Sequence, residues 1–413
     1  ESGAAAKDAA VCPEGWVEDE ARSWSCYPSY GQYVALLQHL AATRPELCRL
    51  VDLGATANAV TPHRLLALVV SDHPEMAEDE PEVLLTSTMH GDETGGFVLL
   101  LRLADHLLAG YGEDAANTLL VDETELWINP NANPDGTYFG GDDSVAGAIR
   151  YYATAAGASS FVDPNRNFPD PDEGDHPDNR TWWPETAAMM ALAGAQTFVL
   201  SANLHGGAEL VNYPWDTFER RHPDDAWFEG LARDWVDLAQ ADGPAGYMTD
   251  RDNGITNGWD WYPVAGGRQD FMTFFHGGRE VTIEMSRAHL LPADELDALW
   301  QWNRRALLDF IGHARRGIRG VVRDRDGAPL AATVEVLGVD RPEDGSRVRT
   351  DPAVGDFHRL LLPGLYDLRF SAPGFEPRVV AGVAVSEGPA AVVDVVLYEE
   401  LTRRPGRRLA PLP

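Results

Sequence analysis

The sequence predicts an α/β protein, in which helices surround a buried sheet and a small antiparallel β-sandwich follows. Three observations predict this class. Apolar runs of strand length alternate with segments of helical periodicity up to about residue 316. Short β-rich runs separated by turn signals fill most of residues 317–400. The chain has 413 residues, which favours more than one domain.

The first 28 residues form a polar segment that precedes the α/β domain, which we expect to span residues 29–316. Apolar residues then recur at helical spacing before Pro45 and predict an amphipathic helix. They are Tyr33, Leu36, Leu37 and Leu40.

Strands and helices alternate over the rest of this domain. The expected strands are 65–70, 83–88, 124–128, 197–204 and 280–285, and the expected helices are 97–108, 186–195, 226–241 and 293–313. Such alternation predicts a layered α/β architecture with a largely buried sheet.

The pattern changes after residue 316. Five β-rich runs are separated by turn dipeptides such as Asp326-Gly327 and Pro373-Gly374, and they predict a small antiparallel sandwich over residues 317–400. These runs are 318–322, 332–337, 365–370, 379–385 and 392–397. Residues 401–413 carry four arginines and three prolines with little to bury, and we expect a loose tail.

The chain is strongly acidic, with 33 Lys+Arg against 65 Asp+Glu and a formal net charge of −32. This charge repels phosphate backbones and anionic lipids, so it argues against nucleic-acid and membrane-surface partners and favours cationic ligands. Solubility or salt tolerance also explains it. No apolar run approaches the roughly 18 residues that span a bilayer.

Three cysteines occur, Cys12, Cys26 and Cys48, too few for a thiolate zinc cluster or a disulfide framework for the whole chain. Pairing of Cys12 with Cys26 fits an oxidising compartment, but all three pairings stay open. No apolar, cleavable leader follows Glu1, which indicates a processed mature chain or a cytosolic one. The cysteines favour export, so we expect a secreted monomer.

Chemistry-bearing residues follow three expected strands. His90 ends one strand and Glu93 lies three positions on, while His205 ends another and is followed by two glycines. Two imidazoles and a carboxylate are a donor set typical of catalytic zinc. In a third strand, alternation places Glu284 on the face opposite Val281, where a buried acid needs a metal-bound water or an arginine beside it.

The chain resembles zinc metallocarboxypeptidases of the regulatory subfamily, the group of carboxypeptidases E, D, M and N. The resemblance rests on MHGDETGG, NPNANPDG, DPNRNFPD, ANLHGGAELVNYPWD, NGITNGWDWYPVAGGRQD and EVTIEMS, which occur in the family order. It covers roughly residues 33–315, and GDFHRLLLPGLYDLRFSAPGF is similar to the transthyretin-like domain that follows in this subfamily.

The resemblance implies a three-layer α/β/α domain with a mixed sheet. It also implies that His90, Glu93 and His205 bind Zn²⁺ and that Glu284 is the general base in hydrolysis of a C-terminal peptide bond. Arg150 is the only Arg or Lys between Arg102 and Arg166, and it is therefore the local candidate for the arginine that holds the oxyanion. The text RYYATAAGASSFVDPNRNF departs here from the subfamily's usual spacing.

The resemblance further assigns substrate contacts. Asn165 and Arg166 match the pair that clamps the substrate's C-terminal carboxylate, and Tyr262 matches the mobile tyrosine that closes over it. Asp216 and Gln269 match the pocket that pairs with a C-terminal Arg or Lys.

Arg268 complicates the predicted specificity, because the subfamily commonly has an uncharged residue there. A guanidinium aimed inward would neutralise Asp216 and relax the preference for basic residues.

The acidic loop 170–178 carries five carboxylates. It is interpreted as a solvated rim that attracts basic peptides, with calcium binding as the alternative. Two other functions stay open for the whole chain. One is a hydrolase of the same fold acting on cell-wall peptides or amides, and the other is a non-catalytic binding homologue.

Overall fold

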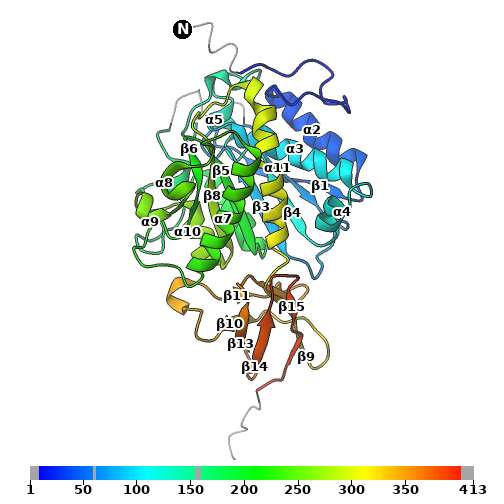
Figure 1. Ribbon diagram of the computed structural model, residues 1–413, viewed down its shortest axis with the longest axis vertical. Helices are drawn as coiled ribbons and strands as arrows, with labels where there is room; N and C mark the ends of the chain where they lie inside the picture. Colours follow the sequence, from blue (N-terminus) through cyan, green and yellow to red (C-terminus); the bar gives the residue numbers. More distant parts are fainter. Residues whose placement is uncertain (1–8, 59–61, 154–159, 401–413) are drawn as a thin grey trace, which may run out of the picture.

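The computed structural model describes residues 9–58, 62–153 and 160–400, so the expected tail at 401–413 lies outside the described residues. The larger part is built on one eight-stranded sheet, in the order β1-β2-β4-β3-β5-β8-β6-β7 (Figure 1). Its strands are β1 (Cys48–Ala55), β2 (Arg64–Val70), β3 (Glu82–Ser87), β4 (Glu125–Asn129), β5 (Leu200–His205), β6 (Ala208–Tyr213), β7 (Ile255–Asn257) and β8 (Arg279–Ser286).

The sheet is mixed, as the resemblance implies. At its centre β4, β3, β5 and β8 run parallel to one another. The pairs β1–β2, β2–β4 and β6–β8 are antiparallel. The carboxyl ends of β3, β5 and β8 therefore lie at one edge of the sheet, where α/β proteins place their sites.

Helices cover both faces of the sheet and complete three layers. Alternation along β2 shows the two faces, because Leu66 and Leu68 enter one core while Ala67 and Val69 enter the other. The first core includes residues of α2 (Tyr30–Thr43), α3 (Gly95–Gly110), α4 (Ala115–Asp122), α7 (Asp225–Asp242) and α11 (Leu296–His313). The second includes residues of α6 (Pro184–Ala195) and α10 (Arg268–His276). The predicted α/β/α class is confirmed.

Three strands of the large sheet escaped prediction: β1, β6 and the three-residue β7. The edge strand β1 buries only its first residue fully, so its apolar pattern is weak. The strand β6 follows His205 after only two residues, so its sequence reads as a continuation of the motif around that histidine. The helices α4 and α10 were also not predicted, nor were the short helical turns α5 (Pro134–Thr137), α8 (Asp250–Asn253), α9 (Gly258–Trp261), η1 (Val145–Gly147) and η2 (Pro164–Arg166). The first turn of the predicted helix 293–313 is a separate element, η3 (Ala293–Glu295).

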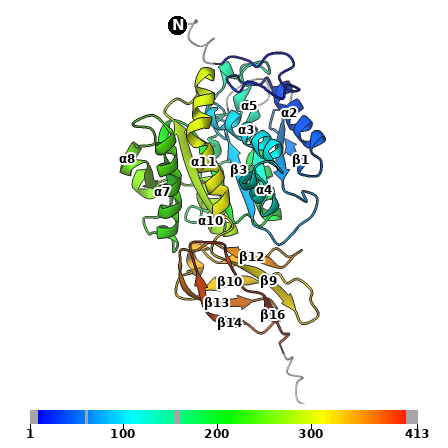
Figure 2. The same cartoon turned by 45° about the vertical axis from the view of Figure 1, so that its right-hand side comes forward.

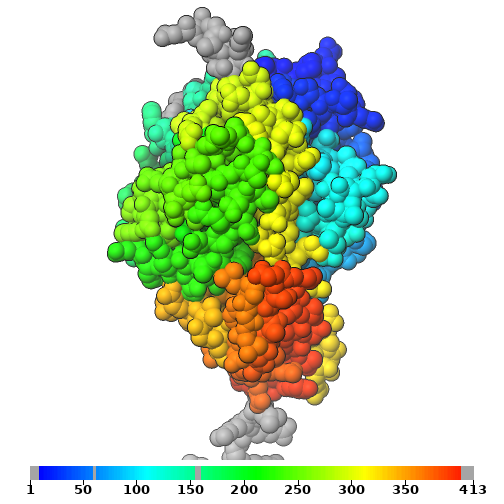
Figure 3. Space-filling model, in the orientation of Figure 1, coloured from blue at the N-terminus to red at the C-terminus, as the bar shows by residue number. Residues whose placement is uncertain are grey.

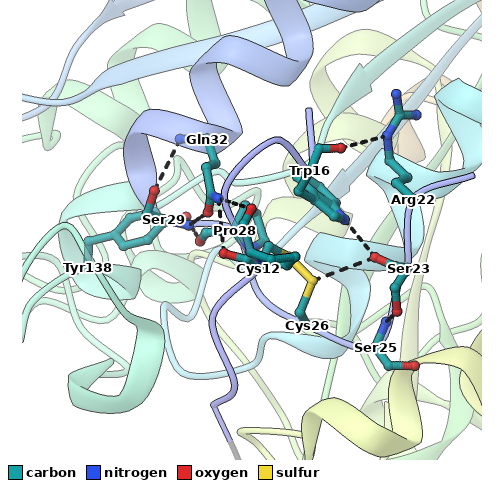
Figure 4. The surroundings of a disulfide bond; sticks show 11 residues. Cys12, Trp16, Arg22, Ser23, Ser25, Cys26, Pro28, Ser29, Gln32 and Tyr138 are labelled. Atoms are coloured by element: carbon teal, nitrogen blue, oxygen red, sulfur yellow. Dashed lines mark hydrogen bonds between the residues drawn. A yellow bond between two sulfur atoms is a disulfide. The ribbon is translucent and has the colours of Figure 1, made fainter. Parts of the chain in front are cut away.

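The N-terminal segment is closed by a disulfide between Cys12 and Cys26 (Figure 4). This bond selects one of the three pairings that the sequence left open. Cys48 is the remaining thiol, and burial raises its pKa to about 12, so it is an inert core residue.

The same segment is anchored beside the carboxyl edge of the sheet. The Tyr27 hydroxyl donates to the Leu291 carbonyl at 2.7 Å and accepts from the Thr94 hydroxyl at 2.9 Å. Thr94 directly follows Glu93 and precedes α3. The segment thus supports the loop that carries His90 and Glu93.

The C-terminal part is a sandwich of two sheets (Figure 2). One sheet contains β11 (Val348–Arg349), β10 (Thr333–Val336), β13 (Gly364–Ser371) and β14 (Arg378–Val385), and the other contains β12 (Asp356–Arg359), β9 (Ile318–Asp324), β15 (Ala391–Val392) and β16 (Val395–Leu397). A turn, η4 (Pro342–Asp344), lies between β10 and β11. The predicted antiparallel sandwich is confirmed, with one addition: β15 and β16 both pair with β9 in parallel.

The sandwich packs against the α/β part (Figures 1 and 3). The contact lies at the amino ends of the parallel strands, since Arg279 at the start of β8 and Arg359 of β12 meet there. A buried ion cluster joins the two parts there. Asp224, next to the start of α7, contacts Arg279 at the start of β8 at 2.6 Å and Arg359 at the end of β12 at 2.8 Å. Because all three charges are buried, each depends on the others for compensation.

Within the described ranges, no helix combines the length and the apolar character that crossing a bilayer requires.

Candidate active site

Three strand ends bring the predicted functional side chains together. His205 is the last residue of β5, and in the parallel pairing with β8 it lies directly opposite Glu284. His90 and Glu93 lie in the turn that follows β3, the neighbour of β5 on its other side. The sheet register therefore gathers residues that are far apart in the sequence.

The turn after β3 has a fixed shape. Thr88 takes a left-handed φ of 59° and its hydroxyl donates to the Glu93 carbonyl at 3.2 Å. Gly96 lets α3 approach the sheet, since a Cβ there would lie 2.8 Å from the side chains of Leu204 and Ser87. These contacts aim His90 and Glu93 at the end of β5.

His90, Glu93 and His205 form a buried cluster. The two carboxylate oxygens of Glu93 lie 2.8 Å from Nδ1 of His90 and 2.7 Å from Nδ1 of His205. The three potential ligand atoms all lie within 4.8 Å of one another. Two imidazole nitrogens and a carboxylate at this spacing are donors suited to zinc.

Outer partners orient both imidazoles. Nε2 of His90 lies 2.9 Å from Asp163, and Nε2 of His205 lies 2.7 Å from the Asn203 amide. Burial lowers the pKa of His205, which favours the neutral form that binds metal. Burial opposes protonation of His90 as well, but the charges of Glu93 and Asp163 outweigh it and raise the pKa of His90 to about 9.

Glu284 lies on the cavity face of β8, as strand alternation predicts, while Val281 and Ile283 enter the core. It is only 8% exposed, and its Oε2 atom accepts no hydrogen bond from the residues that the structure describes. Burial, followed by the charge of Glu93, raises the pKa of Glu284 well above its ordinary value. This carboxylate is therefore placed to take up a proton.

Arg150 lies beside the cluster despite the unusual sequence around it. Its guanidinium donates to Glu93 at 3.1 Å and to Asp163 at 3.1 Å. Asp163 thus holds both Arg150 and His90, a role that sequence reasoning missed. Its position two residues before Asn165 in the quoted motif was the available signal.

One cavity joins this cluster to the predicted substrate contacts. Asn165 and Arg166 line it, and Tyr262 lines it too and is 46% exposed. Sequence reasoning did not assign several other residues of its wall: Gly206, Gly207, Ala208, Asn212, Trp261, Val264, Thr282 and His289. Seven of them lie inside the quoted motifs and His289 lies three residues after EVTIEMS, but none carried a spacing signal of its own.

Asp216 forms a buried part of the same cavity wall. Its Oδ1 atom accepts from the amides of Asn212 at 2.9 Å and Gln269 at 3.1 Å. Gly258 makes room for it, because a Cβ there would lie 1.7 Å from that oxygen. Burial raises the pKa of Asp216 to about 6, against the opposing effect of the Asn212 hydrogen bond.

Arg268 does not take the position that would neutralise Asp216. Its guanidinium is buried and donates to Glu280 at 2.9 Å and to the Thr86 hydroxyl. Glu280 is itself fully buried, so the two form an internal ion pair. The partners that the structure gives Asp216 are the neutral amides of Asn212 and Gln269.

The acidic loop 170–178 divides into two kinds of carboxylate. Asp170 is buried and accepts the backbone N–H of Gly266 at 3.0 Å, which ties the loop to the cavity rim. Asp172, Glu173 and Asp175 are exposed. Within the described part of the chain, this loop contributes to none of the side-chain clusters able to hold a metal.

Comparisons with known proteins agree with this arrangement. Residues 33–306 match the family described as zinc carboxypeptidase, and residues 317–398 match the carboxypeptidase regulatory-like domain. Carboxypeptidase M of Mus musculus is 34% identical over 356 residues, covering 83% of this chain and 77% of that protein. The carboxypeptidase N catalytic chain of Homo sapiens is 34% identical over 405 residues, covering 87% of this chain and 83% of that one.

Solved structures show the same fold. Carboxypeptidase A from Helicoverpa armigera matches with a TM-score of 0.59 at 17% identity, covering 71% of this chain and 75% of its own. The zinc carboxypeptidase family matches about two thirds of this chain, and the two relatives are more than 30% identical to it over most of their own length. The chain therefore belongs to the zinc carboxypeptidase family and is a metallocarboxypeptidase.

Proposed function

We propose that this chain is a zinc-dependent exopeptidase that removes a C-terminal Arg or Lys from peptides. The observation that carries the proposal is the single cavity that holds four groups at once. It is lined by the His90–Glu93–His205 cluster, by Glu284, by the pair Asn165 and Arg166, and by the buried carboxylate of Asp216.

The donor set fits zinc. His90, Glu93 and His205 offer two nitrogens and a carboxylate in a buried cluster, and their outer atoms are already held by Asp163 and Asn203. Zinc bound there supplies a Lewis acid that activates water and polarises a peptide carbonyl.

The protein's own residues perform the proton transfer. Glu284 takes the proton of the attacking water at its unpartnered oxygen and delivers it to the leaving nitrogen. Arg150 lies at the cavity wall within 3.1 Å of Glu93, and from there its guanidinium stabilises the negative charge that develops on the carbonyl oxygen.

Arg166 and Asn165 hold the substrate's C-terminal carboxylate. A guanidinium forms charge-assisted, bidentate hydrogen bonds with a carboxylate, and an internal peptide bond offers no such anion. Tyr262, half exposed at the cavity, covers the bound peptide. These contacts restrict cleavage to the last bond.

Asp216 selects a basic side chain. Its carboxylate is buried among neutral amide donors, so a cationic Arg or Lys compensates its charge while an apolar side chain leaves it desolvated and unpaired. Because Arg268 is engaged by Glu280, the pocket keeps its negative charge.

A dansylated dipeptide ending in Arg and its C-terminal amide test the proposal. We expect release of Arg from the free acid and about 10- to 100-fold lower kcat/KM for the amide, because the amide lacks a charge-assisted hydrogen bond to Arg166. Cleavage of cell-wall peptides or side-chain amides with none of the Arg peptide would contradict the proposal and favour the alternative hydrolase.

The basic preference is expected to depend on pH. The pKa of Asp216 is raised to about 6, so the group is ionised above that pH and neutral below it. We expect the ratio of kcat/KM for Arg-ended over Leu-ended peptides to fall as pH drops through about 6. Measured from pH 5 to 8, the ratio in Asp216→Asn is expected to be flat, and an equally steep decline in that variant would contradict this origin.

We further propose that the protein is exported and acts as a monomer on peptide or protein C-termini. The Cys12–Cys26 disulfide supports export, because such bonds persist in oxidising compartments. The net charge of −32 supports basic peptides as partners.

A further inference from the structure

We propose a second metal site, distant from the cavity, in which Asp79, Asp356 and His358 bind a divalent transition-metal ion at the junction between the α/β part and the sandwich. The potential ligand atoms of these three residues all lie within 4.8 Å of one another. Asp79 lies in the segment before β3, whereas Asp356 and His358 belong to β12 of the sandwich. The site therefore joins the two parts.

An unpartnered buried oxygen points to a ligand here. Asp356 is only 5% exposed, and its Oδ2 atom lies 3.0 Å from Nε2 of His358. Its Oδ1 atom is buried and has no hydrogen-bond partner within the described ranges. A buried carboxylate oxygen without a donor carries a desolvation cost that a cation relieves.

Further buried carboxylates lie near the junction. Glu82 and Glu125, at the amino ends of β3 and β4, are 8% and 7% exposed. Burial raises the pKa of Glu82, and the charges of Glu125, Asp351 and Asp356 add to that effect. Burial also raises the pKa of Asp356, and the charges of Asp79 and Asp351 add to that effect. A bound cation relieves this crowding of acidic groups.

Arg319 compensates only part of this charge. It donates to Oδ2 of Asp79 at 3.1 Å from the neighbouring strand β9. That contact holds Asp79 against the sandwich. Both side chains are partly exposed, so this ion pair lies toward the surface of the junction.

The donor set indicates the class of metal. One imidazole and two carboxylates suit Mn²⁺, Co²⁺ or Zn²⁺, whereas Ca²⁺ takes oxygen ligands alone. The site lies at the amino end of the sheet, where β8 begins. Glu284 lies five residues further along β8, which separates it from the start of that strand by roughly 16 Å. The metal would therefore fasten the sandwich to the sheet and take no part in peptide hydrolysis.

Mn²⁺ binding to the full-length protein, loaded first with one equivalent of zinc, tests the proposal. The single zinc ion occupies the His90–Glu93–His205 cluster because its two imidazoles bind zinc more tightly than the one imidazole of the junction site, which stays open to Mn²⁺. We expect electron paramagnetic resonance to show one Mn²⁺ bound per chain, and the unfolding temperature to rise with Mn²⁺ concentration. The variants His358→Gln and Asp356→Asn are expected to lose at least tenfold in Mn²⁺ affinity and to lose the temperature shift.

The matched control is His73→Gln. His73 lies with Asp72 and Glu78 in an exposed cluster of similar composition near the same junction, and this variant is expected to bind Mn²⁺ as the unmodified protein does. Circular dichroism checks folding, and Asp356→Asn decides the matter if His358→Gln does not fold. No binding up to about 1 mM Mn²⁺, equal binding by His358→Gln or Asp356→Asn, or loss of binding in His73→Gln would each overturn the proposal.

Discussion

Replacing Glu284 by Gln is expected to lower kcat by about 10³-fold on a dansylated peptide ending in Arg. Glu284 is the buried carboxylate whose Oε2 atom accepts no hydrogen bond from the described residues, and burial raises its pKa. Glutamine keeps the size and polarity of the side chain but cannot take up a proton, and general base catalysis typically contributes about 10²- to 10⁴-fold.

Three measurements make this result specific. Zinc content of the Glu284→Gln variant is expected to match that of the unmodified protein, because Glu284 is not one of the three clustered donors. Enzyme treated with a chelator sets the floor of the assay. Glu209→Gln on the neighbouring strand β6 is the matched control and is expected to keep its activity. A Glu284→Gln variant with nearly full kcat would remove Glu284 from the mechanism.

The second large effect concerns Asp216. Asp216→Ala is expected to lower kcat/KM for Arg-ended peptides by about 10²- to 4 × 10³-fold and to raise it for Leu-ended ones. Removing one partner of a buried ion pair costs about 3–5 kcal/mol, and every 1.4 kcal/mol is about tenfold. Asp216 is the buried acid that hydrogen-bonds Asn212 and Gln269 in the cavity wall.

The control for Asp216→Ala is Asp175→Asn, which removes one exposed carboxylate of the rim. That change is expected to lower kcat/KM slightly at low salt and not at physiological salt, since exposed charges are screened. If Leu-ended peptides are already the best substrates of the unmodified protein, Asp216 does not set the specificity.

The fold explains how the sandwich supports the active site without touching it. β8 carries Arg279 at its first residue and Glu284 five positions later. Arg279 is held through Asp224 to Arg359 of the sandwich in a buried cluster. The amino ends of the strands are thus tied to the second part, while their carboxyl ends are free to form the cavity.

Much of this architecture could be predicted from the sequence. Alternating strand and helix patterns give the α/β class, because periodicity is a local property of the chain. The strand-end positions of His90, His205 and Glu284 predict that they share one edge, and parallel register brings His205 opposite Glu284. The edge strand β1 was missed because weak burial leaves little apolar pattern, and β6 was missed because it follows the end of β5 after only two residues.

The sequence by itself determined which residue types this protein has available and their order along the chain, and the resemblance of its motifs to zinc carboxypeptidases implies the roles that we propose for them. Only the tertiary structure decided which partners those groups have. It paired Cys12 with Cys26, turned Arg268 toward Glu280, and set Asp163 between His90 and Arg150. It also assembled the carboxylates of the junction. Such contacts join residues that are distant along the chain, and their distances depend on packing that no local pattern records.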